Sequence, residues 1–448
     1  MSPRRAGWSA IDPKSRSSKA CSRRSNSLRL KFAACYKTVT TPQRTLMQPD
    51  SANRTPGPPI TSVLKSMSQL VSLDFVPFFA SEREYAACRD SILQETDRVL
   101  ETGQVLQGGA VNDVETAIAE FVGRRHAVAV GSGTDALFFS LQAAGVKSGN
   151  EVLVTDFSFV ASASCIARLG AVPVFVDVDP RTLHLDFEKA AAAVTANTKA
   201  IVLVHVFGSM ANPSVAEDFA RCHGLQLVED AAQAFGSAFD GRMGGSIGEV
   251  SCFSFDPTKP LAAPSSGGMV LTDDAGIAAH VRRLRYHGKT REGSFVEVGY
   301  NSQMSTLTAA VLLLKLRQSP QWQRTRQQIT EYYVEQLVEL DVALIHVPSA
   351  VTHCHHKFVL RTSRRDELRR FLNQQHVETR VHYAVPLHRQ PCFRRHTTMN
   401  DAEFENTLAC VETVVSLPIH AFLTDAEVER VCSSVCQFFH QPAKLVSL

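Results

Sequence analysis

The sequence predicts an α/β fold, with a large domain on a mostly parallel seven-stranded sheet and a smaller C-terminal α/β domain. From about residue 80, short β-branched runs alternate with longer helical periods, as in successive βαβ units. The chain has 448 residues, of which 44% are hydrophobic and 20% charged, which is enough for more than one domain. Beyond about residue 305 the pattern changes to a long helix and then a second β-α-β run.

Seven apolar runs are the expected strands of the large domain, and helical stretches separate them. The expected strands are Ala127 to Val130, Glu151 to Val154, Val172 to Val176, Ala200 to Val204, Gln226 to Val228, Val250 to Ser254 and Met269 to Leu271. The expected helices are Thr134 to Ala144, Val160 to Arg168, Phe187 to Val194 and Ser214 to Cys222. Seven strands with helical crossovers predict one large domain over residues 71–330.

A long helical stretch from Ser305 to Leu340, which we expect Pro320 to interrupt, leads into a smaller domain over residues 331–448. There we expect strands at His356 to Arg361 and Glu378 to His382, and helices at Arg364 to Gln375, Asp401 to Thr413 and Asp425 to Phe439. Thr424 precedes acidic residues and is the expected N-cap of the last helix.

Residues 1–70 form a basic tail with thirteen Lys or Arg against Asp12 and Asp50, a charge of +11, so the rest of the chain carries −8 of the total of +3. Its Ser-, Arg- and Pro-rich composition predicts disorder, and a charged tail without a folded scaffold does not indicate nucleic-acid binding. Two interpretations stay open. The tail is a transit peptide, or the reading frame begins too early and Met67 is the natural start.

Composition also indicates the cellular compartment and whether a membrane or a metal is involved. There is no apolar run of about 18 residues and no secretory signal, so we expect neither a membrane span nor secretion. Eleven scattered cysteines, with Cys165 and Cys252 in apolar runs, predict buried thiols in the reducing cytoplasm. The adjacent residues from His353 to His356 cannot easily converge on one ion, so we expect no metal.

Three motifs at predicted strand ends carry chemistry. Gly131-Ser132-Gly133-Thr134 joins a strand to a helix, where free N–H groups favour phosphate, although such turns also serve packing. Asp230 follows the Gln226 strand, where an acid can hold a pyridine nitrogen protonated or simply cap a helix. Lys259 follows the Val250 strand. In a partly apolar cleft such a lysine can attack an aldehyde, although most lysines are solvated.

In this order the motifs resemble the fold-type I enzymes that use pyridoxal 5'-phosphate (PLP), and specifically the DegT/DnrJ/EryC1/StrS sugar aminotransferase family. The resemblance runs from about Val76 over more than 80% of the chain. It is carried by the segments GSGTDAL, SFVASASCIA, VEDAAQAFGS, CFSFDPTK with the later SGG, GYNSQMSTLTAA, HYAVPLHRQP and SLPIHAFLT.

The resemblance implies a role for each matching residue. Lys259 would form the Schiff base with PLP and move protons in the reaction. The other implied cofactor contacts are Gly133, Thr134 and Ser254 on the phosphate, Phe159 stacked on the ring, Asp230 on the ring nitrogen, Gln233 on the phenolic oxygen, and Asn301 on the phosphate in a neighbouring subunit. A homodimer with shared sites follows. Tyr383 and His388 would line the substrate pocket, although either could be structural.

The implied reaction transfers an amino group from an amino acid, expected to be glutamate, to a keto-sugar nucleotide. One alternative is a PLP-dependent deoxysugar dehydratase, but relatives of that type carry histidine in place of the lysine found here as Lys259. Another is a non-catalytic PLP-binding regulator. Such regulators usually carry a helix-turn-helix domain, which residues 1–70 do not resemble.

The chain departs from the family pattern in three places. It has Ser265-Ser266-Gly267-Gly268 where Gly-Asp-Gly-Gly is frequent, and Gln303 where an arginine usually follows Asn-Ser. The segment from Cys392 to Asn400 also lacks the frequent Gly-rich acidic stretch. The cofactor chemistry is unaffected, but the identity of the sugar stays open.

Overall fold

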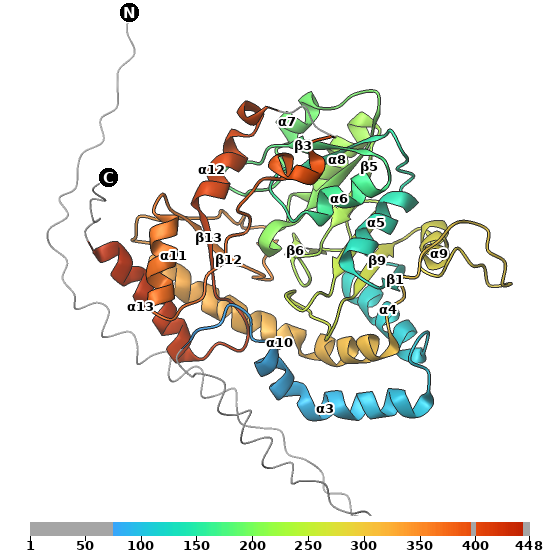
Figure 1. Ribbon diagram of the computed structural model, residues 1–448, viewed down its shortest axis with the longest axis horizontal. Helices are drawn as coiled ribbons and strands as arrows, with labels where there is room; N and C mark the ends of the chain where they lie inside the picture. Colours follow the sequence, from blue (N-terminus) through green and yellow to red (C-terminus); the bar gives the residue numbers. More distant parts are fainter. Residues whose placement is uncertain (1–74, 396–399, 442–448) are drawn as a thin grey trace, which may run out of the picture. The chain divides into compact units, whose positions relative to one another are not determined.

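A seven-stranded sheet forms the centre of the computed structural model, which describes residues 75–395 and 400–441 (Figure 1). The strands lie in the order β1-β9-β8-β5-β4-β2-β3. Only β9 runs antiparallel to its neighbours. The strands are β1 His126–Val130, β2 Glu151–Thr155, β3 Val172–Val176, β4 Thr198–Val204, β5 Gln226–Asp230, β8 Val250–Ser254 and β9 Gly268–Thr272. The predicted mostly parallel sheet is confirmed, with each predicted strand within two residues of its observed bounds.

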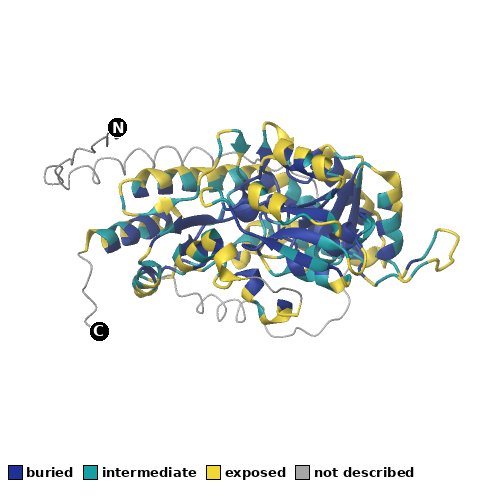
Figure 2. Ribbon diagram, turned by 90° about the horizontal axis from the view of Figure 1, so that it is seen from above, coloured by how far each residue is buried: buried dark blue, intermediate teal, exposed yellow. Residues whose placement is uncertain are grey.

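Helices cover both faces of this sheet, and its strands are therefore buried on both sides (Figure 2). Along β1 the side chains alternate. Val128 and Val130 join one hydrophobic cluster, and Ala127 and Ala129 join another. The helices of this region are α4 Gly109–Val122, α5 Gly133–Ala143, α6 Ala161–Arg168, α7 Phe187–Ala192, α8 Pro213–His223 and α9 Ala275–Leu284. Cys165 and Cys252 are buried, as predicted, and each described cysteine is a free thiol.

Two long helices, α3 Ser81–Thr102 and α10 Thr306–Leu337, lie side by side below the sheet in the view of Figure 1. The predicted interruption of α10 at Pro320 is wrong, because the helix continues through the proline. Proline cannot donate to the carbonyl of residue 316. The hydroxyl of Ser319 donates to that carbonyl instead, at 2.8 Å, and so replaces the missing bond.

A second, three-stranded antiparallel sheet contains β10 Ala343–Leu344, β12 Phe358–Arg361 and β13 Val414–Leu417. The predicted strand from Glu378 to His382 is wrong. Its segment makes an isolated bridge from Arg380 to Ser416, while β13, which was not predicted, pairs with β12 along its length. A third small sheet joins β11 Val351–Thr352, β6 Ala238–Phe239 and β7 Arg242–Met243.

The helices of the C-terminal region are α11 Arg365–Gln374, α12 Glu405–Thr413 and α13 Asp425–His440, with short 3₁₀ turns η2 Val206–Gly208, η3 Leu387–Arg389, η4 Pro391–Phe393 and η5 Asp401–Glu403. The prediction that Thr424 caps α13 is confirmed, since its hydroxyl accepts from the backbone of Glu427 and the Glu427 carboxylate accepts in return. The same carboxylate binds Arg83 of α3 through two bonds of 2.7 Å. The start of α3 is thereby tied to the start of α13.

The described residues, 75–395 and 400–441, belong to one unit by their contacts. The predicted boundary near residue 330 falls inside α10, where Ile329 and Tyr333 pack into a hydrophobic cluster with β12 and β13, so the division into two domains stays a prediction. The N-terminal tail and its predicted disorder lie outside the described residues. Among the helices of residues 75–395 and 400–441, none is long and apolar enough to cross a membrane.

Candidate active site

Three predicted motifs lie at one edge of the central sheet. Strands β1, β5 and β8 share one direction, because β9 is antiparallel to both β1 and β8 while β5 is parallel to β8. Their carboxyl ends therefore meet at the same edge, the usual location of ligand sites in open α/β sheets. Gly131, Asp230 and Ser254 stand at or directly after these ends.

The turn between β1 and α5 packs so closely against the end of β8 and the start of β9 that two glycines have no room for a side chain. A β-carbon at Gly133 would lie 2.5 Å from Oγ of Ser254, and one at Gly268 would lie 2.3 Å from the carbonyl oxygen of Ser132. Glycine is required at both positions because no side chain fits. The first N–H groups of α5, capped by Ser132 through a 3.0 Å bond from Asp135, lie beside the Ser254 hydroxyl and can bind phosphate.

Asp230 ends β5 and is 6% exposed. Its Oδ2 accepts a 2.9 Å bond from the Ser162 hydroxyl, and Ser158 lies 3.0 Å beyond Ser162. Its Oδ1 accepts from the backbone of Ala232 at 3.2 Å. These bonds fix the orientation of the carboxylate at the edge of the sheet.

Lys259 lies in the turn after β8, where its backbone N–H donates to the carbonyl of Asp256 at 2.9 Å. Burial lowers the pKa of its ammonium, and the carboxylates of Asp230 and Asp256 partly oppose this shift. The lowered pKa makes the nucleophilic amine form of Lys259 easier to reach.

Aromatic and amide groups complete this edge. The ring of Phe159, in the loop after β2, is 52% exposed and lies 6.4 Å from the ring of Tyr383. The amide of Gln233 donates to the Tyr383 hydroxyl at 3.1 Å and accepts from the backbone of Phe207 at 2.9 Å. Burial raises the pKa of Tyr383, so its phenol stays protonated. An exposed Phe159 face is available for stacking on a planar ligand.

Asn301 is exposed, and its side-chain oxygen accepts a long 3.5 Å bond from the amide of Gln303. Its neighbour Ser302 accepts from the backbone of Gly131 at 3.0 Å and donates to Asp135 at 2.8 Å. Asn301 thus directly precedes a residue that contacts the Gly131 turn. This position is compatible with the predicted contact to another subunit, which stays a prediction.

His388 is occupied by other groups. Its Nδ1 lies 2.6 Å from Asp156 and its Nε2 lies 3.0 Å from Asp401, while its ring stacks on Phe404 at 4.3 Å. Both ring nitrogens are engaged, so we find no free nitrogen with which His388 could bind a substrate. The structure brings Tyr383 to the site through Gln233 but places His388 in this separate polar cluster.

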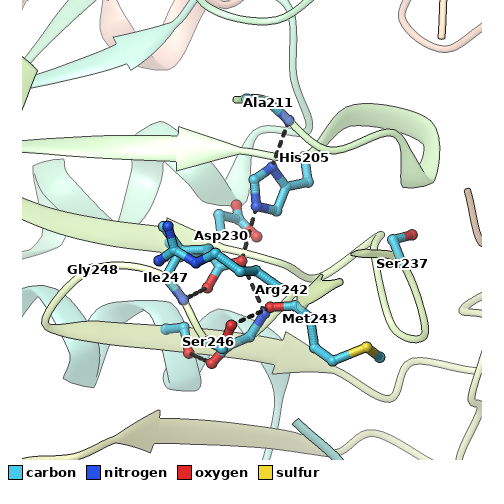
Figure 3. Close-up of polar contacts among 12 residues, drawn as sticks. His205, Ala211, Asp230, Ser237, Arg242, Met243, Ser246, Ile247 and Gly248 are labelled. Carbon is cyan, nitrogen blue, oxygen red and sulfur yellow. Dashed lines mark hydrogen bonds and ion pairs between the residues drawn. The ribbon is translucent and has the colours of Figure 1, made fainter. Parts of the chain in front are cut away.

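The buried pair of His205 and Glu229 was not predicted from the sequence. His205, just after β4, binds Glu229 through its Nε2 at 2.8 Å and accepts from the backbone of Ala211 at its Nδ1 (Figure 3). The Glu229 carboxylate also accepts from the backbones of Gly245 and Ile247 at 2.9 and 2.8 Å. Glu229 therefore anchors the loop before β8. The isolated His205 in the sequence gave no signal of this partner.

The histidine-rich segment also has its own local contacts. His353 and His355 stack at 4.6 Å, and the thiol of Cys354 donates to the carbonyl of Gln233 at 3.3 Å. Within residues 75–395 and 400–441, no group of three His, Cys, Asp or Glu side chains is arranged to hold a metal ion.

The residues at this edge fit PLP. The N–H groups at the start of α5, packed against the Ser254 hydroxyl, suit a phosphate, and a buried carboxylate held by Ser162 suits a protonated ring nitrogen. A lysine of lowered pKa follows the neighbouring strand β8. Together with the mostly parallel seven-stranded sheet, they define a PLP-dependent enzyme of fold type I.

The chain belongs to the DegT/DnrJ/EryC1/StrS aminotransferase family, whose model matches residues 87–436. It is 35% identical over 367 residues to a pleiotropic regulatory protein of Geobacillus stearothermophilus, covering 81% of this chain and 98% of that protein. It is 33% identical to a UDP-2-acetamido-2-deoxy-3-oxo-D-glucuronate aminotransferase of Pseudomonas aeruginosa, covering 80% of this chain and 99% of the relative.

Solved structures agree. DesV of S. venezuelae superposes with a TM-score of 0.80 at 32% identity, covering 82% of this chain and 99% of that one. NtdA of Bacillus subtilis, solved with its bound cofactor PMP, gives a TM-score of 0.76 at 26% identity and covers 83% of this chain and 87% of its own. The family and fold expected from the motifs are confirmed.

Proposed function

We propose that this protein is an aminotransferase that moves an amino group from glutamate to a keto-sugar nucleotide. The observation that carries the proposal is the convergence of Asp230, Lys259 and the Gly133–Ser254 contact at one sheet edge. The aminotransferases among the relatives support the acceptor class, since the Pseudomonas aeruginosa protein is named for a keto-sugar nucleotide. The regulatory name of another relative leaves turnover as the point to test.

PLP bound at this edge would supply an electron sink and a carrier for the amino group. The protein side of the mechanism follows from its own groups. The Lys259 amine, deprotonated more readily because burial lowers its pKa, would hold the cofactor and would move a proton at the reacting carbon. The Asp230 carboxylate, oriented by Ser162, would hold the ring nitrogen protonated.

Other groups position the ligand. The N–H groups at the start of α5, with Thr134 and Ser254, would bind the phosphate, and Phe159 would pack on the ring face. The Gln233 amide donates to the hydroxyl of Tyr383 and so holds Tyr383 at the site. The same amide would also donate to the phenolic oxygen of the cofactor. These roles are proposals from position and hydrogen-bonding capacity.

We also propose a homodimer in which Asn301 reaches the phosphate site of the partner. The segment between α9 and α10 extends away from the sheet in both views (Figures 1 and 2). It exposes Phe295, Val296 and Val298 by 67%, 60% and 88%. Apolar side chains exposed together in this way are typical of an interface. Free thiols throughout the described residues support a reducing, cytoplasmic compartment.

A half-reaction tests the function. Purified enzyme mixed with glutamate, without acceptor, should lose its PLP absorbance as the amine form accumulates and should release one equivalent of 2-oxoglutarate. A panel of keto-sugar nucleotides then identifies the acceptor by return of the PLP spectrum. A protein that binds PLP but leaves its spectrum unchanged with glutamate and the other common amino acids is a binding protein, and the proposal is wrong.

A further inference from the structure

A small cationic cavity lies beside Lys259. It has a volume of about 30 Å³, enough for one or two water molecules. Lys259, Arg326 and Lys357 line it together with the rings of Phe79 and Phe422. Arg326 comes from α10, and Lys357 directly precedes β12, so two separate elements bring their cations to the lysine expected to hold the cofactor.

Lys357 is buried without a counterion. It is 8% exposed, and its Nζ lies 4.4 Å from the ring centroid of Phe79 and 5.0 Å from that of Phe78. Among the described residues, no carboxylate makes an ion pair with Lys357 or with Arg326. The aromatic faces offset only part of the cost of burying an ammonium group.

The nearest acids are already engaged. Glu84 lines the same cavity, but it pairs with Lys315 at 2.5 Å. Asp256 accepts from the backbone and the hydroxyl of Thr258, at 3.0 and 2.6 Å. Burial lowers the pKa of Lys357, with Lys259 and Arg326 adding to the shift. Asp256 opposes this shift only in part, so the ammonium form of Lys357 is disfavoured as the cavity stands. An anion bound between Lys357 and Arg326 would stabilise both cations.

We propose that Lys357 and Arg326 bind a carboxylate of the amino donor. A planar guanidinium and an ammonium on two sides of a small cavity suit a carboxylate, whereas a sugar or a nucleotide is far larger than 30 Å³. The place next to Lys259 keeps the amino group of the donor near the reacting atoms. This inference rests on the proposed function and adds to it the recognition of the donor.

The test uses the holoenzyme and the variants Lys357→Gln, Lys357→Arg and Arg326→Gln, with exposed Lys147→Gln as the matched control. In the half-reaction with glutamate, Lys357→Gln and Arg326→Gln should each raise the KM about 10-fold or more, since a charged hydrogen bond is lost. Lys357→Arg should recover most of the affinity, and Lys147→Gln should behave as wild type. PLP affinity should change less than about twofold.

A second readout does not depend on turnover. Calorimetry with succinate, a dicarboxylate that cannot react, should give a Kd that rises about 10-fold in Lys357→Gln and Arg326→Gln. Binding of UDP-N-acetylglucosamine and of its uronate analogue should be the same in wild type and variants. Circular dichroism and the PLP spectrum check folding, and Arg326→Gln and Lys357→Arg serve if Lys357→Gln does not fold.

Unchanged glutamate KM and succinate affinity in the variants would overturn the inference. So would a selective loss of uronate binding, which would assign the cations to an acidic sugar, or an equal loss of PLP affinity, which would assign them to the cofactor. Failure of the proposed function is separate. A wild-type enzyme that does not convert its cofactor with glutamate refutes that function, whereas succinate binding still reports on the cavity.

Discussion

Glu229 and Asp230 are adjacent in β5, yet their carboxylates serve opposite sides of the sheet. Asp230 accepts from the Ser162 hydroxyl at 2.9 Å on the side of the candidate site. Glu229 accepts from His205 at 2.8 Å and from two backbone amides of the loop before β8. The alternation of side chains along a strand separates the two acids, so they form a matched pair for mutation.

Replacing Asp230 with Asn should lower kcat of the glutamate half-reaction by about 10²-fold or more, because the ring nitrogen loses its stabilising anion. The fold should persist, since Asn keeps the shape and can still accept from Ser162. Stopped-flow absorbance measures the rate, and thermal melting checks the fold. Activity within a few-fold of wild type would remove Asp230 from the mechanism.

Replacing Glu229 with Gln should lower the stability and leave the activity nearly unchanged. The amide places a donor against backbone N–H groups that need an acceptor, so the free energy of unfolding should fall by about 1–3 kcal/mol. Once the variant is folded, its glutamate half-reaction should remain within a few-fold of wild type. Chemical denaturation measures the stability. A stable but inactive Glu229→Gln would show that this acid, not Asp230, serves the chemistry.

Replacing Gly133 with Ala should weaken PLP binding about 10-fold or more, because the new β-carbon would lie 2.5 Å from the Ser254 hydroxyl and push the turn out of place. Gly109→Ala is the control, since a β-carbon there meets nothing within 4 Å. Fluorescence titration of the apoprotein with PLP gives both affinities. Equal affinities would mean that the turn does not bind the phosphate.

His388→Asn should reduce stability in a pH-dependent way. Burial lowers the pKa of His388, but bonds to Asp156 and Asp401 raise it more, so the net shift is upward. The stabilisation is therefore complete below the unfolded value of about 6.5 and is lost as pH rises through the folded pKa. Urea unfolding from pH 6 to 9 should show a gap between wild type and variant that narrows with pH. A widening gap would reverse the assigned sign.

Replacing both Phe295 and Val298 with Asp should dissociate the proposed dimer, because charges would replace the exposed apolar side chains of the α9–α10 segment. If Asn301 acts across the interface, the loss of the dimer should also lower the affinity for PLP. Analytical ultracentrifugation gives the mass, and PLP titration gives the affinity. Exposed Val215→Asp on α8 is the control. A variant that stays dimeric with full affinity would place the interface elsewhere.

The central sheet was predictable because short apolar strand segments alternate with helical periods in the sequence of βαβ units. Turn glycines and acids also mark the ends of the strands. The predicted interruption at Pro320 was wrong because a proline usually leaves a helix carbonyl without a donor. Here the neighbouring Ser319 hydroxyl donates to that carbonyl, and the sequence rule takes no account of such a bond. The β13 strand was missed because its pairing with β12 joins residues more than fifty positions apart. Such long-range pairing has no local signature.

At the site, sequence order identified Lys259 and Asp230, but not their neighbours. Ser162 is an ordinary residue of an Ala- and Ser-rich helix until the fold brings it to Asp230. Nothing in the sequence distinguishes Lys357 from the other lysines. Only the structure shows that it is buried and lines the same cavity as Lys259. For His388 the sequence predicted a role that the contacts do not support. Its motif indicated a substrate contact, but Asp156 and Asp401 occupy both ring nitrogens.

The covalent link between Lys259 and PLP is the central claim and can be measured directly. Reducing the yellow protein with borohydride and digesting it should yield one pyridoxyl-modified peptide, the one containing Lys259, and Lys259→Ala should yield none. A label on Lys357 or another lysine, or a protein that takes up no PLP and no label, would contradict the account.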